Sequence, residues 1–397
     1  MRILVVICLG MAAVAQGQTD STPCFPEGYE VVAHLDCGGA VSSAAVSGSR
    51  FEVVRGAAGT VPNVPGGIGT TLVDAEKVGL TASGLNAGDA YVLYVAWYGE
   101  DVTQSVYLGP LGGELSCVLP PTLAKSFYED KPTWSSFPLP LPSTATAGGK
   151  VCIEIRKQSG AAASVSEVWL LRKKDATPHK KLLIVTGDDY PGHRWRLTAP
   201  EFARIFREDP QVEVSIAETP TILGSPLLKH YDGVMIHFKN YSQRLPLGQV
   251  VWDGLRMYAE QGGGLIVAHF GCGALQEWDG YVQVAGRVWN PAMRAHDPYG
   301  PFDVHIVDGK HPITRDMKDF STQDELYSCL DGTPGIQVLC EATSKVDQKA
   351  YPMGFAFGPG KGRVFHCTLG HDVNALSAEG PRALYRRGAR WILGLDQ

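Results

Sequence analysis

Residues 262–274 read GGGLIVAHFGCGA, an order that predicts a turn, a buried strand and a second turn. Glycine adopts backbone angles that other residues avoid, so the three leading glycines suit the first turn. The apolar run Leu-Ile-Val-Ala is typical of a parallel strand that is covered on both faces. His269 and Cys272 follow this strand directly. Ligands of open α/β sheets bind outside the carboxyl ends of the strands, so we expect both side chains near a site.

Apolar runs and amphipathic segments alternate over the C-terminal half of the chain around this strand. Such alternation predicts right-handed crossovers and a parallel sheet with flanking helices, an α/β fold. Irregular segments and antiparallel strands are expected between residues 289 and 365. The other expected elements are strands at 182–186, 212–216, 233–238 and 362–367, and helices at 198–208, at 249–260 and at the C-terminus.

The preceding residues, 25–174, predict an all-β region. Short segments rich in β-branched and aromatic residues alternate here with Gly and Pro turns, which suggests a β-sandwich or jelly roll. Such a module could bind carbohydrate, with Trp97, Tyr98 and Trp134 as stacking platforms. The alternative, which the strand context of Trp97 favours, is that these aromatic residues fill the core.

The length of 397 residues predicts two domains, 25–174 and 181–397, which the charged segment 172–180 would link. A net charge of −6 and the absence of a long basic run give no reason to expect binding to nucleic acid. No apolar run approaches the length of a membrane span. The sequence indicates no particular oligomeric state.

Residues 1–15 have the features of a signal peptide: a positive start at Arg2, an apolar core, and small residues before a cleavage point near Ala15. We therefore expect an exported protein, periplasmic or extracellular. Of the nine cysteines, Cys8 would leave with the signal, and the other eight fall four in each half. Disulfides and buried free thiols are both compatible with this distribution.

Four histidines occupy the same structural position, just after predicted strands: His193, His237, His269 and His371. The carboxyl ends of parallel strands share one edge of a sheet, so we expect these side chains to converge in a cleft. Histidine is the commonest metal ligand, and the four predict a divalent metal, zinc or similar. A structural role for each histidine is the alternative. Further expected site residues are Asp324 and Glu325 as general acid and base, and Asp189, Trp195, Trp278, Tyr327 and Asp372 as substrate contacts.

Cys272 supports a competing interpretation, since a thiol after a strand and a sharp turn is similar to a nucleophile elbow. A cysteine nucleophile also needs a histidine to accept its proton, and His371 is the candidate. However, His269 occupies the elbow position itself, and a buried or bridged Cys272 is the simpler interpretation.

Residues 181–395 resemble the trehalose-utilisation (ThuA-like) family. Several sequence pieces in the right order carry the resemblance: GHRW at 192–195, the glycine-rich strand at 262–269, FDVHIVDGKHPIT at 302–314, DELY at 324–327, GKGRVFH at 360–366 and LGHD at 369–372.

The resemblance implies a fold similar to class I glutamine amidotransferases, with a flavodoxin-like parallel sheet. The family lacks the catalytic cysteine of that fold, and in this chain His269 stands at the elbow. Relatives are associated with the breakdown of sugars, including 3-keto derivatives of disaccharides. The implied function is metal-assisted processing of a glycoside or 3-keto sugar. A non-catalytic glycan-binding protein and a cysteine hydrolase that uses Cys272 are the alternatives.

Overall fold

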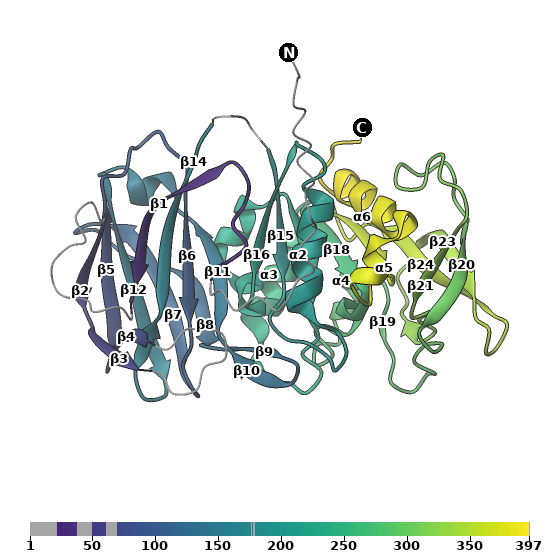
Figure 1. The fold of residues 1–397 in the computed structure, drawn as a ribbon, viewed down its shortest axis with the longest axis horizontal. Helices are drawn as coiled ribbons and strands as arrows, with labels where there is room; N and C mark the ends of the chain where they lie inside the picture. Colours follow the sequence, from purple (N-terminus) through teal and green to yellow (C-terminus); the bar gives the residue numbers. More distant parts are fainter. Residues whose placement is uncertain (1–21, 38–49, 61–69, 176, 178, 397) are drawn as a thin grey trace, which may run out of the picture.

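The computed structural model describes residues 22–37, 50–60, 70–175, 177 and 179–396. The expected signal peptide, residues 1–15, lies outside the described residues. A β-rich N-terminal region packs beside a mixed α/β C-terminal region (Figure 1). Within the described ranges, no helix is both long enough and apolar enough to cross a membrane.

Antiparallel sheets build the N-terminal region, as its pattern of short strands predicts. The four-stranded sheet has the order β1 (Tyr29–Asp36), β14 (Glu167–Lys173), β6 (Tyr91–Trp97) and β11 (Ser135–Pro140). The five-stranded sheet has the order β2 (Phe51–Arg55), β5 (Lys77–Ser83), β12 (Lys150–Ser159), β7 (Thr103–Pro110) and β8 (Ser116–Leu123). Smaller elements are β13 (Ala163–Val165), β4 (Thr70–Asp74), β3 (Ala57–Thr60), the hairpin of β9 (Ser126–Tyr128) and β10 (Lys131–Thr133), and α1 (Ser143–Thr146).

The aromatic residues singled out in this region are core residues. Trp97 is fully buried, and Tyr98 and Trp134 are only 6% and 4% exposed. Trp97 packs against Phe137 of β11 with ring centroids 4.6 Å apart. The core interpretation is therefore confirmed, and these three side chains are not available as platforms for sugar.

A nine-stranded sheet forms the C-terminal region. Its first five strands are parallel and its last four antiparallel, as the patterns before and after residue 289 predict. The strands, in order across the sheet, are β16 (Val212–Ala217), β15 (Lys180–Val185), β17 (Gly233–Ile236), β18 (Gly264–Ala268), β25 (Arg363–Cys367), β24 (Ala350–Phe357), β23 (Gln337–Thr343), β20 (Gly300–Ile306) and β21 (Phe320–Asp324). A separate pair joins β19 (Val288–Trp289) to β22 (Leu330–Asp331).

Both faces of the parallel strands are buried, which explains their uninterrupted apolar runs. In β18, Leu265 and Val267 face one hydrophobic core, and Ile266 and Ala268 face another. The second core contains α2 (Trp195–Phe206), α5 (Val373–Ser377) and α6 (Glu379–Ile392), and the first contains α3 (Gln249–Glu260) and α4 (Tyr281–Ala285). Three 3₁₀ turns complete the described elements: η1 (Pro220–Gly224), η2 (Pro226–His230) and η3 (His269–Gly273).

The three glycines before β18 are required for two different reasons. Only Gly262 has a positive φ, of 118°. At Gly263 a Cβ atom would lie 2.3 Å from the ring of Tyr258, and at Gly264 it would lie 2.5 Å from the carbonyl oxygen of Ile392. The expectation that all three serve backbone freedom is therefore too broad, because two of them make room for α3 and α6.

The two regions of the chain share packing and hydrogen bonds. The first hydrophobic core joins side chains of the N-terminal sheets to residues of β15, β17 and β18. The Glu218 N–H donates to the Ser136 carbonyl at 2.7 Å, and the Trp195 indole donates to the Phe127 carbonyl at 2.7 Å. Within the expected linker, 172–180, β14 ends at Lys173 and β15 begins at Lys180. Separate folding of 25–174 and 181–397 stays a prediction.

All eight cysteines of the described ranges are free thiols. Five of them are buried, namely Cys37, Cys272, Cys329, Cys340 and Cys367. They act as small apolar core residues, which is the second of the two interpretations of the cysteine pattern.

One buried histidine of the sheet gives a testable pH dependence. His366 in β25 is fully buried, and its Nδ1–H donates to the Ala285 carbonyl at 2.9 Å. Burial lowers its pKa from 6.5 to about 4. The unfolded chain therefore binds a proton at higher pH than the folded chain, so the free energy of unfolding falls as the pH drops from about 6.5 towards 4.

His366→Asn keeps a donor for the Ala285 carbonyl but cannot titrate. Between pH 8 and pH 5, we expect the free energy of unfolding of the wild type to fall by about 2 kcal/mol more than that of this variant. Urea unfolding of both proteins at the two pH values measures the difference. An equal loss in the two proteins would show that His366 is not the titrating group.

Candidate functional site

Four side chains converge at the carboxyl edge of the parallel strands. His193 lies between β15 and α2, His269 directly follows β18, and His371 lies between β25 and α5. Glu325 follows β21, at the far antiparallel edge of the sheet. One ligand atom from each residue lies within 4.8 Å of the ligand atoms of the other three. We call these four residues the His/Glu cluster.

The spacing within the His/Glu cluster suits a shared cation. Nε2 of His193 and Nε2 of His269 are 3.1 Å apart. Oε2 of Glu325 lies 3.2 Å from Nδ1 of His371, 3.5 Å from Nε2 of His269 and 3.7 Å from Nε2 of His193. Ligands about 2.1 Å from one tetrahedral ion lie about 3.4 Å from each other. These four separations bracket this value, and all of the ligand atoms lie within 4.8 Å of one another.

Two further observations support the fit. The Nδ1 atom of His269 is 2.6 Å from the Thr368 carbonyl and must donate to it, which leaves the Nε2 lone pair directed at the cluster. Oε2 of Glu325 and Nδ1 of His371 are buried without a hydrogen-bond partner among the described residues. Buried polar atoms are normally paired, so a cation between them would satisfy both.

Burial and charge set the protonation of the cluster. Burial lowers the pKa of His269 to about 4 and also lowers the pKa of His193, so both rings are neutral at pH 7. Burial opposes the charge of Glu325, but the neighbouring imidazoles outweigh it and hold the pKa of this carboxyl below its usual range. Neutral imidazoles and an ionised carboxylate are the forms that bind metals.

His269 has an unusual backbone conformation. Its φ is 45°, in the left-handed region that residues other than glycine seldom adopt. The strand β18 ends at Ala268, so His269 lies outside the sheet and begins η3. The turn directs the ring away from the strand and towards His193.

The structure does not bring His237 into the cluster. Its Nε2 pairs with the Thr198 hydroxyl at 2.8 Å, and its ring packs edge-on against Phe202 and Phe270. Complete burial lowers its pKa to about 3. His237 therefore has the environment of a neutral core histidine, and its expected role as a ligand has no geometric support.

Asp324 and Glu325 have different surroundings although they are adjacent. The Asp324 carboxylate is fully buried and accepts the backbone N–H groups of Gly370 at 2.6 Å and His371 at 3.2 Å. Burial raises its pKa to about 7 despite these bonds. Asp324 thus fixes the loop that carries His371, whereas Glu325 faces the cluster.

The residues that were expected to contact substrate also lie in different surroundings. Tyr327 lies at the cluster, with its hydroxyl 3.0 Å from Nε2 of His269. Asp372 caps α5 and accepts a hydrogen bond from Tyr299 at 3.1 Å. Trp278 lines a neighbouring cavity. Asp189 is buried and accepts the backbone N–H of residue 129.

Trp195 was expected to contact substrate, but it is buried between the two regions of the chain. It is only 1% exposed, and it packs on Tyr128 of the hairpin with ring centroids 5.8 Å apart. Its indole N–H is already bonded to the Phe127 carbonyl. Trp195 therefore joins the two regions of the chain and does not face a substrate.

Two residues at the site were not expected from the sequence. His296 places its Nε2 3.8 Å from Oε1 of Glu325, while its Nδ1 donates to the Asp297 carbonyl. Lys239 places its Nζ 4.4 Å and 4.0 Å from the ring centroids of Tyr190 and Trp289. His296 follows none of the predicted strands. Lys239 comes three residues after the end of β17 but is a lysine, so the pattern of strand-end histidines does not include it.

Fold and site together define a mixed α/β protein whose strand ends gather three histidines and a glutamate. The model of the ThuA family, described as trehalose utilisation, matches residues 181–392. The chain belongs to this family, and the resemblance seen in the sequence is confirmed.

Solved structures with similar folds align to little more than half of the chain. A protein of Parabacteroides merdae described as ThuA-like is 20% identical, over 55% of this chain and 90% of its own, with a TM-score of 0.47. Another from Bacteroides uniformis is 18% identical, over 56% and 95%, with a TM-score of 0.46. A glutamine amidotransferase from Thermotoga maritima is 14% identical, over 55% and 99%, with a TM-score of 0.37. No curated protein gives a significant match.

Proposed function

We propose that this protein is an exported carbohydrate-processing enzyme that acts, with the help of a divalent metal, on a glycoside or a 3-keto sugar. The observation that carries the proposal is the convergence of four ligand atoms, from His193, His269, His371 and Glu325, within 4.8 Å of one another. The class of substrate comes from the family, whose description is trehalose utilisation.

His193, His269, His371 and Glu325 would hold the cation, zinc or a similar metal. Imidazole nitrogens and a carboxylate oxygen are among the ligand atoms that bind zinc. Burial opposes the charge of His371, but the Glu325 carboxylate outweighs burial and raises the pKa of His371, so a bound metal would displace a proton from this ring. A bound metal would supply Lewis acidity towards a sugar carbonyl or a water molecule. Glu325, which the sequence suggests as an acid or base, becomes a ligand in this proposal, and His237 is left out of the ligand set.

We assign proton transfer to His296 in place of Asp324. The side chain of His296 is 33% exposed, so substrate and water reach it, and its Nε2 carries the free lone pair. Asp324 cannot serve in the same way because its carboxylate is fully buried and bonded to backbone N–H groups. A general base must reach the proton that it abstracts.

The order of the parallel strands supports this location. The strands β16, β15, β17, β18 and β25 lie across the sheet in the order 2-1-3-4-5 of their sequence. This is the order of flavodoxin-like folds, which bind ligands where the first and third strands diverge. We propose that the C-terminal domain is flavodoxin-like, and that the two large N-terminal sheets form a sandwich of the jelly-roll type. An experimental structure in which either region has another strand order would exclude the proposal for that region.

A cysteine hydrolase based on Cys272 is disfavoured by the environment of this thiol. Cys272 is completely buried beside Tyr327 and Cys329, and burial raises its pKa. A nucleophilic thiol needs a lowered pKa and a nearby base. A non-catalytic glycan-binding protein remains the alternative and would bind sugar without turnover.

Metal analysis combined with a substrate screen tests the proposed function. We expect about one equivalent of zinc or a similar metal per chain, and turnover of a glycoside or its 3-keto form that stops after chelation and returns with metal. Full turnover by the metal-free protein would contradict the proposal. Sugar binding without turnover over the whole screen would favour the binding protein.

Export is a separate part of the proposal. Cleavage near Ala15 should give a mature chain that lacks residues 1–15. N-terminal sequencing of the protein purified from its native host would show this, whereas a mature chain that starts at Met1 would exclude it.

A further inference from the structure

The hairpin of β9 and β10 extends from the N-terminal region towards the C-terminal region (Figure 1). There it contacts residues 187–194, between β15 and α2, which we call the His193 loop. The Phe127 N–H of the hairpin donates to the carbonyl of Gly187, at the start of this loop, at 2.9 Å. The N-terminal region therefore reaches the segment that supplies one residue of the His/Glu cluster.

The turn of the hairpin has an unusual composition. Strands β9 and β10 pair directly across a two-residue turn, Glu129 and Asp130, whose φ angles are 49° and 62°. Two-residue turns in which both φ angles are positive favour Asn-Gly, because other side chains are disfavoured in the left-handed region. Such residues persist where their surroundings hold them, and they concentrate at functional sites. Contacts with the rest of the chain, and not local backbone preference, must therefore explain Glu-Asp at this turn.

Glu129 binds the His193 loop on both sides of the histidine. Its backbone N–H donates to the carboxylate of Asp189, which is almost completely buried. Its own carboxylate lies 2.7 Å from Nε of Arg194, the residue that directly follows His193. One turn residue thus holds the loop before and after its cluster residue.

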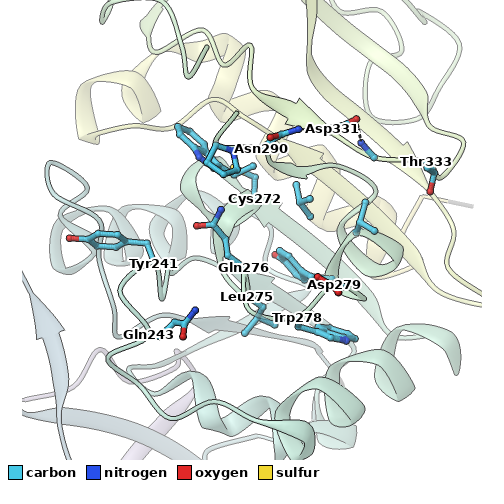
Figure 2. Close-up of a pocket in the computed structure, with 16 residues that line it drawn as sticks. Tyr241, Gln243, Cys272, Leu275, Gln276, Trp278, Asp279, Asn290, Asp331 and Thr333 are labelled. Carbon is cyan, nitrogen blue, oxygen red and sulfur yellow. Dashed lines mark hydrogen bonds between the residues drawn. The ribbon is translucent and has the colours of Figure 1, made fainter. Parts of the chain in front are cut away.

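Asp130 acts on the same loop through Arg244. Oδ1 of Asp130 accepts a hydrogen bond from Nη1 of Arg244 at 2.9 Å. Nη2 of this guanidinium donates to the Asp188 carboxylate and, at 3.0 Å, to the Asp189 carbonyl. The Tyr241 hydroxyl, which Figure 2 shows pointing away from the other labelled side chains, donates to Asp130 at 3.3 Å. A planar guanidinium that binds through two nitrogens fixes the geometry of its partners.

The orientation of His193 depends on these anchors. A histidine that binds a metal usually donates its other ring N–H to a fixed partner, as His269 does to the Thr368 carbonyl. Nδ1 of His193 has no such partner among the described residues. The loop is also locally permissive, because Gly187 and Gly192 have φ angles of 119° and 94°. Contacts from outside the loop must therefore fix its course, and the hairpin supplies several of them.

We propose that Glu129 and Asp130 of the N-terminal region are positioning residues of the site in the C-terminal region. They fix the His193 loop so that His193 meets the other three residues of the His/Glu cluster. This inference rests on the proposed function for the role of the cluster, and it gives the N-terminal region a part in the metal site.

The test replaces the turn in the full-length protein by Asn-Gly, that is, Glu129→Asn with Asp130→Gly. This sequence suits the turn and keeps the N–H group of residue 129, but it removes both carboxylates. Both side chains are 47% exposed, so their ion pairs contribute little to global stability, and we expect an unchanged or higher thermal midpoint.

Zinc affinity should nevertheless fall about tenfold, the low end of the effect of a residue that orients a metal ligand. Competition with a chromophoric chelator measures this affinity. In the metal-free protein, amide hydrogen exchange of residues 187–194 should become faster, because the loop opens more often.

Glu100→Asn with Asp101→Gly is the matched control. The same two residue types lie here between β6 and β7, Asp101 also has a positive φ, of 54°, and its carboxylate lies 3.0 Å from Nζ of Lys125. This variant should change neither zinc affinity nor the exchange of the His193 loop.

Equal zinc affinities of the two variants, or an unchanged exchange of residues 187–194 in the Asn-Gly variant, would overturn the inference. A wild type that binds no zinc would contradict the proposed function, and the hydrogen exchange would then decide alone whether the hairpin positions the loop.

Discussion

Replacing Glu325 by glutamine is expected to weaken the affinity for zinc by about 100-fold or more. Loss of a partner that only orients a ligand costs about 10- to 100-fold, and Glu325 is proposed as a ligand itself. The substitution keeps the size of the side chain, so the packing around Oε2, 3.2–3.7 Å from three imidazole nitrogens, is preserved. Competition with a chromophoric chelator measures the affinity.

The same substitution should lower the stability of the metal-free protein at pH 7. Burial opposes the charge of Glu325, but the neighbouring imidazoles hold its pKa below the usual range, so the folded state favours the ionised carboxylate, and glutamine lacks this charge. Glu341→Gln is the control, because Glu341 lies in β23 away from the cluster. An unchanged zinc affinity for Glu325→Gln would remove Glu325 from the ligand set. A thermal midpoint without metal that is unchanged or higher in Glu325→Gln would show that the imidazoles do not favour the charge of Glu325.

Gly264→Ala is expected to destabilise the fold by about 3 kcal/mol or more. A Cβ atom at this position would lie 2.5 Å from the carbonyl oxygen of Ile392 and 2.9 Å from its Cβ. Because the obstacle includes backbone of α6, the helix itself must move, and overpacking of this kind costs about 1–3 kcal/mol even where side chains can adjust.

Gly335→Ala is the matched control, since a Cβ atom there would meet nothing within 4 Å. Urea unfolding of both variants gives the two free energies. A loss of less than about 1 kcal/mol for Gly264→Ala would show that α6 moves at little cost. A steric conflict with Ile392 would then not explain the glycine.

The sequence predicts the sheet and its helices well because their signals are local. The apolar run of β18 and the amphipathic period of α3 are each contained in a dozen residues, and the predicted helix 249–260 coincides with α3. The role of Gly264 is not local. Its need for space comes from Ile392, which is 128 positions away in the sequence, so only the structure reveals it.

The site is partly predictable for the same reason. Parallel strands share one edge, which brings His193, His269 and His371 together as expected. The rule fails for His237, because Thr198 of α2 takes its Nε2. It also does not reveal that Glu325 faces these rings while Asp324 faces backbone, since this depends on the direction of two adjacent side chains in an irregular segment.

X-ray absorption at the zinc edge of the metal-loaded protein tests the central claim, that the His/Glu cluster is a metal site, most directly. We expect about one zinc ion per chain, with only nitrogen and oxygen ligands at about 2.0–2.1 Å, of which about three are imidazoles. Sulfur at about 2.3 Å would place the metal at cysteines such as Cys272 and Cys329. That result, or a protein that binds no divalent metal at all, would contradict the account.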